Sequence, residues 1–178
     1  MGMMLRIIIT LIVICTIYFL FFNEPGNKSK NEEKTLYERL GGIYVISGLV
    51  DHFSDAVIND PIAGKNSSNP CLKKWYAEKM DQRLSGLKWM RTLWVCDQAG
   101  GPYKYVPTVG TGSDLQDAHE NLHISPEEFD AVAKVLSDSL DHFSVPGKEK
   151  AEVLAVFSKH KDQVNHGSRY GKCPFGKF

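Results

Sequence analysis

Hydrophobic residues recur along most of the chain at spacings of three and four, which is typical of one face of an α-helix. These stripes fall within residues 36–40, 43–59, 72–98, 115–122, 126–143 and 153–164. No segment of useful length alternates between polar and apolar residues as a β-strand would. The pattern therefore predicts an all-α chain of about six helices of unequal length. Strong glycine and proline breaks separate them, which is not the pattern of a regular bundle.

The first 22 residues form a separate apolar unit. No charge occurs from Ile7 to Phe22, and a helix of that length with the three preceding apolar residues can cross a hydrocarbon layer of about 30 Å. We expect an uncleaved transmembrane anchor over residues 1–22, touching membrane lipid through residues 3–22. A cleaved signal peptide is the alternative, although the run ends in bulky rather than small residues, and a buried core helix is a third. We expect a single-pass membrane protein whose main domain lies on the periplasmic or extracellular side.

A polar linker over residues 23–34 precedes the main domain, which we place at residues 35–166. Thr35 and Glu38 open it as a capping box, and Ser125, Pro126 and Glu128 repeat that signal at the start of the 126–143 helix. Residues 167–178 are rich in glycine and lysine, and we expect them to form a flexible tail.

Charge and cysteine content remove several classes of protein. The 21 basic and 21 acidic residues balance, so the chain has no electrostatic footprint for nucleic acid. Its four cysteines form no CxxC pair and are too few for a disulfide scaffold. An apolar content of 43% also excludes wholesale disorder.

Two side chains stand out as candidates for chemistry. His119 shares a helix face with Leu115 and Leu122, and an imidazole in an apolar wall needs a hydrogen bond or a metal. A zinc site with His123 lacks a third ligand nearby. Arg91 interrupts the apolar stripe of the 72–98 helix. Its guanidinium must reach water, meet a buried acid or bind an anionic ligand group.

Three motifs, in this order along the chain, resemble the group I truncated haemoglobins. They are Thr35-Leu36-Tyr37-x-x-Leu40-Gly41-Gly42, the stretch CDQAGGP at 96–102 with Tyr105, and Ala118-His119-x-x-Leu122-x-Ile124 with Phe129-Asp130. The resemblance implies a two-over-two helical globin-like sandwich that holds haem b. It implies that His119 is the ligand of the haem iron and that O2, NO or CO binds reversibly.

The resemblance also implies a set of residues that contact the cofactor. We expect the haem pocket to involve Phe53, Ser54, Leu87, Lys88, Met90, Arg91, Val95, Leu115, Leu122, Phe129 and Val132. Among these, Lys88 or Arg91 is expected to pair with a haem propionate.

The sequence departs from the family on the ligand side of the haem. Ser54 stands where the family usually has a tyrosine, and Leu87, Met90 and Arg91 include no distal histidine. We therefore expect a less polar pocket than is usual for the family, in which Arg91 is the one residue able to compensate. Met90 as a sixth iron ligand is an alternative.

Three functions follow from this reading. The first is a gas-binding globin. The second is a haem-based redox enzyme or sensor, such as a nitric-oxide dioxygenase or peroxidase, which would need a reductase partner. The third is a cofactor-free helical interaction domain on a membrane tether.

Overall fold

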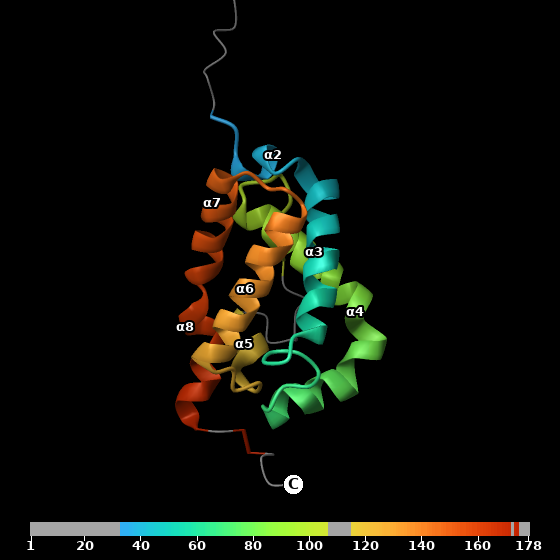
Figure 1. The fold of residues 1–178 in the computed structure, drawn as a ribbon, viewed down its shortest axis with the longest axis vertical. Coiled ribbons are helices and arrows are strands. Elements are labelled where there is room, and N and C mark those ends of the chain that lie inside the picture. The colour runs from blue at the N-terminus through green and yellow to red at the C-terminus, as the bar shows by residue number, and fades with distance from the viewer. Residues whose placement is uncertain (1–32, 107–114, 172, 175–178) are drawn as a thin grey trace, which may run out of the picture. The chain divides into compact units, whose positions relative to one another are not determined.

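The helices predicted from the sequence are present, and they make an all-helical domain. The computed structural model describes residues 33–106, 115–171, 173 and 174, and this part of the chain contains no strand (Figure 1). Its elements are α2 (Leu36–Arg39), α3 (Gly42–Asn59), α4 (Pro70–Gln98), α5 (Leu115–Glu120), α6 (Pro126–His142), α7 (Gly147–Ser158), α8 (Lys161–Val164) and the 3-10 helix η1 (His166–Tyr170).

The long helices pack in the order α4–α3–α6–α7 across the domain. Helix α4 packs on α3, α3 packs on α6, and α6 packs on α7 (Figure 1). The short helix α5 lies against α8 and η1. The pair α3–α4 thus faces the pair formed by α6 and α7–α8, and this is the two-over-two arrangement that the motifs implied.

Local side-chain caps explain where the helices begin. The side chains of Thr35 and Ser125 each accept a hydrogen bond from the backbone N–H three residues later. In turn, the carboxylates of Glu38 and Glu128 accept from the backbone N–H of Thr35 and Ser125, so both predicted capping boxes are confirmed. The side chain of Asn69 accepts hydrogen bonds from the backbone N–H groups of Cys71 and Leu72 in the first turn of α4, which begins at Pro70.

Tyr37 joins the two glycine pairs that the sequence motifs contain. Its hydroxyl accepts a hydrogen bond from the N–H of Ile43, and its own N–H donates to the carbonyl of Ala99. A Cβ on Gly101 would lie only 2.7 Å from the ring of Tyr37. Glycine at 101 therefore lets the end of α4 approach α2 closely.

Three clusters of buried apolar residues make up the described core. One joins α3 to the end of α4 through Ile46, Val50 and Cys96. A second joins α3 to α6 through Leu49, Leu136 and Leu140. A third joins the start of α4 to α6 through Leu72, Ile124 and Phe129. The described core is thus divided among three contacts: α3 with the end of α4, α3 with α6, and the start of α4 with α6.

Two helix boundaries differ from those predicted. The last helix is broken at residues 159–160 into α7 and α8, although the apolar spacing continued through it. Helix α5 ends at Glu120, so Leu122 lies in the following turn and not on the helix face of His119. Its side chain packs with the cluster of Leu72, Ile124 and Phe129 instead.

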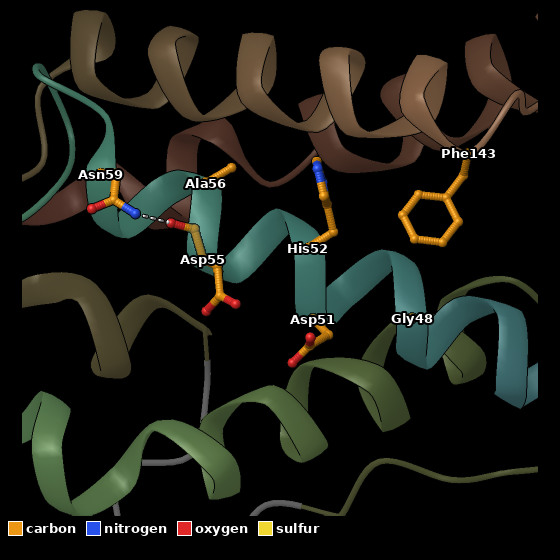
Figure 2. A pocket seen from close by; sticks show the side chains of 7 residues that line it. All are labelled: Gly48, Asp51, His52, Asp55, Ala56, Asn59 and Phe143. Atoms are coloured by element: carbon orange, nitrogen blue, oxygen red, sulfur yellow. Dashed lines mark hydrogen bonds between the residues drawn. The ribbon is translucent and has the colours of Figure 1, made fainter.

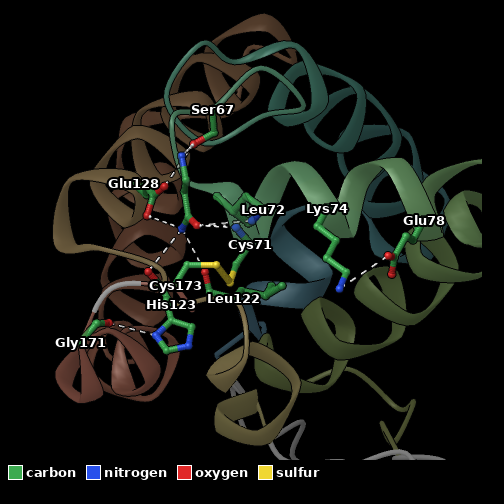
Figure 3. The surroundings of a disulfide bond; sticks show 11 residues. Ser67, Cys71, Leu72, Lys74, Glu78, Leu122, His123, Glu128, Gly171 and Cys173 are labelled. Carbon is green, nitrogen blue, oxygen red and sulfur yellow. Dashed lines mark hydrogen bonds and ion pairs between the residues drawn. A yellow bond between two sulfur atoms is a disulfide. The ribbon is translucent and has the colours of Figure 1, made fainter. Parts of the chain in front are cut away.

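The end of the chain is also more ordered than the sequence suggested. A disulfide joins Cys71, at the start of α4, to Cys173 (Figure 3). Gly167 is buried and lies against the carbonyl of Glu120. The expectation of a flexible tail from residue 167 therefore does not fit the described residues, because a covalent bond and a close backbone contact hold them.

The expected transmembrane anchor, residues 1–22, lies outside the described residues. Among the helices that the structure does describe, none is both long and apolar enough to cross a bilayer.

Candidate functional site

The ring of His119, the residue predicted to bind the haem iron, makes a hydrogen bond with the backbone of its own helix. It lies near the end of α5, and its Nδ1 is 2.7 Å from the carbonyl oxygen of Leu115, one turn earlier. A carbonyl oxygen only accepts hydrogen bonds, so Nδ1 must carry the proton. In the neutral ring the other nitrogen, Nε2, then keeps a free lone pair for a metal.

The surroundings of His119 favour that neutral ring. Burial lowers the pKa of the imidazole from its ordinary value, the hydrogen bond with Leu115 opposes this, and the positive charge of Arg91 lowers it further. Arg91 thus lies within electrostatic reach of His119, although the two residues come from different helices. A neutral imidazole with one nitrogen fixed by a carbonyl is the form that binds haem iron.

His123, four residues later, is directed elsewhere. Its backbone has a φ of 48° in the turn after α5. Its Nδ1 donates to the carbonyl of Gly171, 3.0 Å away, in the segment tied down by the disulfide (Figure 3). The two histidines therefore have different partners, His119 within α5 and His123 in the segment after η1.

Arg91 and Ser54 form a polar contact between α4 and α3. Arg91 comes from α4, and its Nη1 donates to the hydroxyl of Ser54 on α3 over 3.0 Å. Ser54 is fully buried. Burial lowers the pKa of the Arg91 guanidinium, with a partial opposing effect from Tyr76, but arginine stays protonated in proteins.

Lys88 has other partners than the one expected for it. Its ammonium group lies 2.6 Å from a carboxylate oxygen of Asp51 and 2.7 Å from one of Asp55, both on α3. These two ion pairs hold α4 against α3, and they raise the pKa of Lys88 against the effect of burial. Lys88 thus has two acid partners within the protein, and the pairing of Lys88 or Arg91 with a haem propionate stays a prediction.

The apolar residues expected in the pocket fall into different surroundings. Val95 packs against the cluster of Ile46, Val50 and Cys96, and Phe53 packs against that of Leu49, Leu136 and Leu140. Phe129 is buried and stacks on Phe157, with ring centres 4.8 Å apart. Leu87, Leu115 and Val132 are half-buried, as are Phe53, Val95 and Leu122. Met90 is 42% exposed and so is not enclosed by the described residues.

Tyr76 is an interior residue that the sequence reasoning missed. Its hydroxyl donates to the carbonyl of Ala63, 3.2 Å away, and its ring packs on the cluster of Leu72, Ile124 and Phe129. Burial raises its pKa, and the charge of Arg91 opposes that rise. Its position on the apolar side of α4, four residues after Leu72, was the available signal.

An open hollow on the surface along α3 is distinct from this site (Figure 2). Its lining residues are Gly48, Asp51, His52, Asp55, Ala56, Asn59 and Phe143. In Figure 2 the ring of His52 points toward α6, where it meets the hydroxyl of Ser139 at 3.2 Å. The lining of the hollow includes neither His119 nor Arg91.

Comparisons with known proteins agree with this geometry. A family model for bacterial-like globins matches residues 35–166. A group 1 truncated hemoglobin of Synechocystis sp. is 31% identical over 126 residues, covering 68% of this chain and 88% of the relative. One of Chlamydomonas moewusii is 26% identical over 132 residues, covering 73% and 67% respectively.

Solved structures show the same fold. The 2/2 hemoglobin of Synechococcus sp. PCC 7002, solved in the cyanomet state with covalently attached heme, superposes with a TM-score of 0.61 at 20% identity. The superposition covers 75% of this chain and 99% of the Synechococcus chain. The family match spans most of the chain, and the fold and the motifs agree with it. The chain therefore belongs to the bacterial-like globin family, as a truncated haemoglobin of group 1.

Proposed function

We propose that this haem-binding globin holds its iron through Nε2 of His119 and receives O2 or another diatomic gas on the side of Arg91 and Ser54. The observation that carries the proposal is the hydrogen bond between His119 Nδ1 and the Leu115 carbonyl. It fixes the proton on one nitrogen and leaves the other as a ligand atom. The same contact orients the ring along α5.

When bound, haem would supply an iron able to take up one diatomic ligand reversibly, and His119 would hold that iron. The residues around it set how long the ligand stays. A serine hydroxyl at position 54 is too short to replace a phenol as a hydrogen-bond donor, and it already accepts a bond from Arg91. Arg91 has further N–H groups that can donate to a ligand, so it supplies the distal hydrogen bond in place of a tyrosine.

Replacing His119 tests the proposal directly. The variant His119→Ala is expected to lose or greatly weaken haem binding, because no other described histidine presents a free nitrogen in the same place. The measurement is the Soret band and the ferrous spectrum after reconstitution with haem. His119→Gly is expected to recover the spectrum when free imidazole is added, since imidazole fills the space of the removed ring.

The matched control is His123→Ala, which removes a histidine four residues away. Because His123 donates to the carbonyl of Gly171, its loss should leave the spectrum nearly intact. If His123→Ala removes the spectrum and His119→Ala does not, the assignment of the ligand is off by one turn. If neither variant changes it, His119 does not hold the haem.

The apolar run of residues 1–22 supports a single-pass membrane anchor, and the disulfide supports an oxidising compartment for the globin domain. Disulfides persist in the periplasm and outside the cell and are rare in the cytosol. The bridge between Cys71 and Cys173 therefore favours the periplasmic or extracellular side.

Intact-mass measurement of the protein from the membrane fraction tests this placement. The expected mass includes residues 1–22 and lacks two hydrogens, as one disulfide requires. A mature protein that starts near Asn23 and stays in the soluble fraction would contradict the anchor. Four thiols that are all open to alkylation in freshly prepared cells would contradict the compartment.

A further inference from the structure

Asn69, at the start of α4, uses both ends of its side-chain amide. Its oxygen accepts hydrogen bonds from the N–H groups of Cys71 and Leu72, at 3.0 and 3.4 Å, and so caps α4. Its Nδ2 lies 3.0 Å from the carbonyl oxygen of Leu122 and 3.3 Å from that of His123. One side chain therefore joins the first turn of α4 to the turn that follows α5, which comes 53 and 54 positions later in the chain.

A buried acid holds the amide of Asn69 in this orientation. The carboxylate of Glu128 accepts a hydrogen bond from Nδ2 over 3.2 Å, and it also accepts from the hydroxyl of Ser67 and the N–H of Ser125. Both Ser67 and Glu128 are buried. The carbonyl oxygens near Asn69 only accept hydrogen bonds, so the nitrogen of the amide, and not its oxygen, must face them.

Helix α5 depends on the contacts made at its end. It has six residues, none of them buried, and a helix of that length is not stable on its own. The N–H of Leu122 donates to the carbonyl oxygen of His119 over 2.9 Å, so the turn that Asn69 holds is bonded to His119 itself. The next residue, His123, has a φ of 48°, a backbone conformation that its neighbours must maintain.

We propose that Asn69 is a positioning residue for the haem ligand: its amide holds the turn after α5 and so fixes the orientation of His119. Leu115 orients the ring within α5, and Asn69 orients the end of α5 against α4. The inference rests on the proposed ligation of the iron by His119 and adds to it a residue of another helix. The competing role for Asn69 is that of a helix cap alone, whose bonds to the turn have no effect on His119.

The variant Asn69→Ser separates these two roles. Serine caps a helix about as well as asparagine, but it lacks the amide nitrogen that reaches the turn. We expect the iron–histidine stretching band of the ferrous, ligand-free protein to shift and broaden, because the orientation of His119 is less well defined. Resonance Raman spectroscopy measures this band. In the same haem-loaded samples, amide hydrogen exchange over residues 115–123 should become about 5-fold faster, which corresponds to the loss of one hydrogen bond.

Two control variants are matched to the two roles. His123→Ala removes the bond to Gly171 but keeps both carbonyls that accept from Asn69, so the band should stay in place. Thr35→Ala removes the cap of α2, and it should lower the thermal midpoint without moving the band. If Asn69→Ser behaves like Thr35→Ala, with a lower midpoint and an unchanged band, Asn69 is a cap alone and the inference is overturned.

If Asn69→Ser does not retain haem, Asn69→Gly provides the test, because glycine is tolerated at a helix cap and removes the same donor. An unchanged band in that variant overturns the inference and leaves His119 as the ligand. A band that persists in His119→Ala, or that the wild type lacks, would instead overturn the proposed function and with it the inference.

Discussion

Gly167 brings the last helical turn of the chain against the helix that carries His119. A Cβ at this position would lie 1.8 Å from the carbonyl oxygen of Glu120, closer than any two such atoms can approach. The obstacle is backbone, so no side-chain rotation can relieve it. A single hydrogen in place of a methyl group therefore sets the distance between η1 and α5.

Gly167→Ala is expected to push η1 away from α5 and to loosen the support of His119. Overpacking of this kind typically costs about 1–3 kcal/mol, so we expect a lower thermal midpoint and faster loss of haem. Gly147→Ala is the matched control, because no atom lies within 4 Å of the Cβ it would add. Equal behaviour of the two variants in thermal denaturation would show that the contact is not tight in solution.

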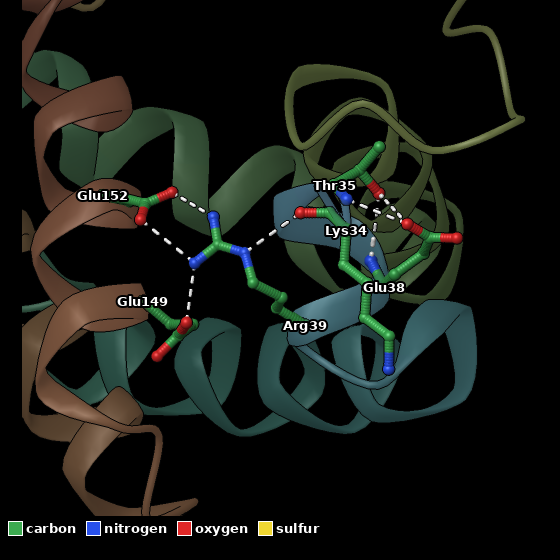
Figure 4. Close-up of polar contacts among 6 residues, drawn as sticks. All are labelled: Lys34, Thr35, Glu38, Arg39, Glu149 and Glu152. Atoms are coloured by element: carbon green, nitrogen blue, oxygen red, sulfur yellow. Dashed lines mark hydrogen bonds and ion pairs between the residues drawn. The ribbon is translucent and has the colours of Figure 1, made fainter. Parts of the chain in front are cut away.

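At the scale of whole elements, Arg39 fastens α2 to α7 (Figure 4). Its guanidinium lies 2.6 Å from a carboxylate oxygen of Glu149 and also forms an ion pair with Glu152. The hydrogen bonds from Arg39 lower the pKa of both glutamates. Helix α2 has only four residues, so this cluster and the contact of Tyr37 hold a segment too short to be stable alone.

These lowered pKa values set the direction of a pH effect. In the unfolded chain the glutamates titrate near 4.5, and in the fold they titrate lower, so the contribution of the cluster is fully present above about pH 5. It is lost as the pH falls through the folded pKa values, where the carboxylates are protonated.

Removing Arg39 should therefore flatten part of the acid dependence. We expect Arg39→Met to lower the thermal midpoint near neutral pH and to change it progressively less as the pH falls through the folded pKa values of the two glutamates. Lys134→Met serves as a control, since its pair with Asp138 is exposed and lies within one helix. If Arg39→Met lowers the thermal midpoint as much in acid as at neutral pH, the cluster of Arg39, Glu149 and Glu152 is not the source of this acid dependence.

At the scale of the whole molecule, the bond between Cys71 and Cys173 closes a loop of 102 residues. It joins the start of α4 to the segment that follows η1 (Figure 3). The side chain of Asn69, two residues before Cys71, donates hydrogen bonds to the carbonyls of Leu122 and His123. The loop includes both Arg91 and His119. A cross-link over such a loop restricts the unfolded chain strongly.

Cys173→Ser is expected to lower the free energy of unfolding by about 2–5 kcal/mol. The measurement is denaturant unfolding of both proteins, with and without a thiol reductant. Reductant should lower the midpoint of the wild type to that of the variant and should not affect the variant. Cys96 is buried as a free thiol, so it offers no second bridge that could explain a response of Cys173→Ser to reductant.

Features set by neighbouring residues could be predicted from the sequence. The capping boxes of Thr35 and Ser125, and the breaks at Gly41 and Pro61, depend on contacts within a few residues. The motif around His119 also singled out a histidine whose ring is oriented by a residue only four positions earlier, Leu115. Even so, the break between α7 and α8 was missed, because the apolar spacing of Phe157 and Val164 continues across it and a helix period cannot reveal it.

Contacts between distant residues were decided by the tertiary structure alone. The sequence could not pair Cys71 with Cys173, turn Lys88 toward Asp51 and Asp55, or place the hydroxyl of Ser54 against Arg91. Each of these contacts joins residues 33 or more positions apart, and helical periodicity states only which face a residue occupies, not which helix that face meets. The sequence by itself determined the helices, their caps and the family. The packing of α3 on α4, and of η1 on α5, decided which side chains meet, including the ion pairs of Lys88 and the contact of Arg91 with Ser54.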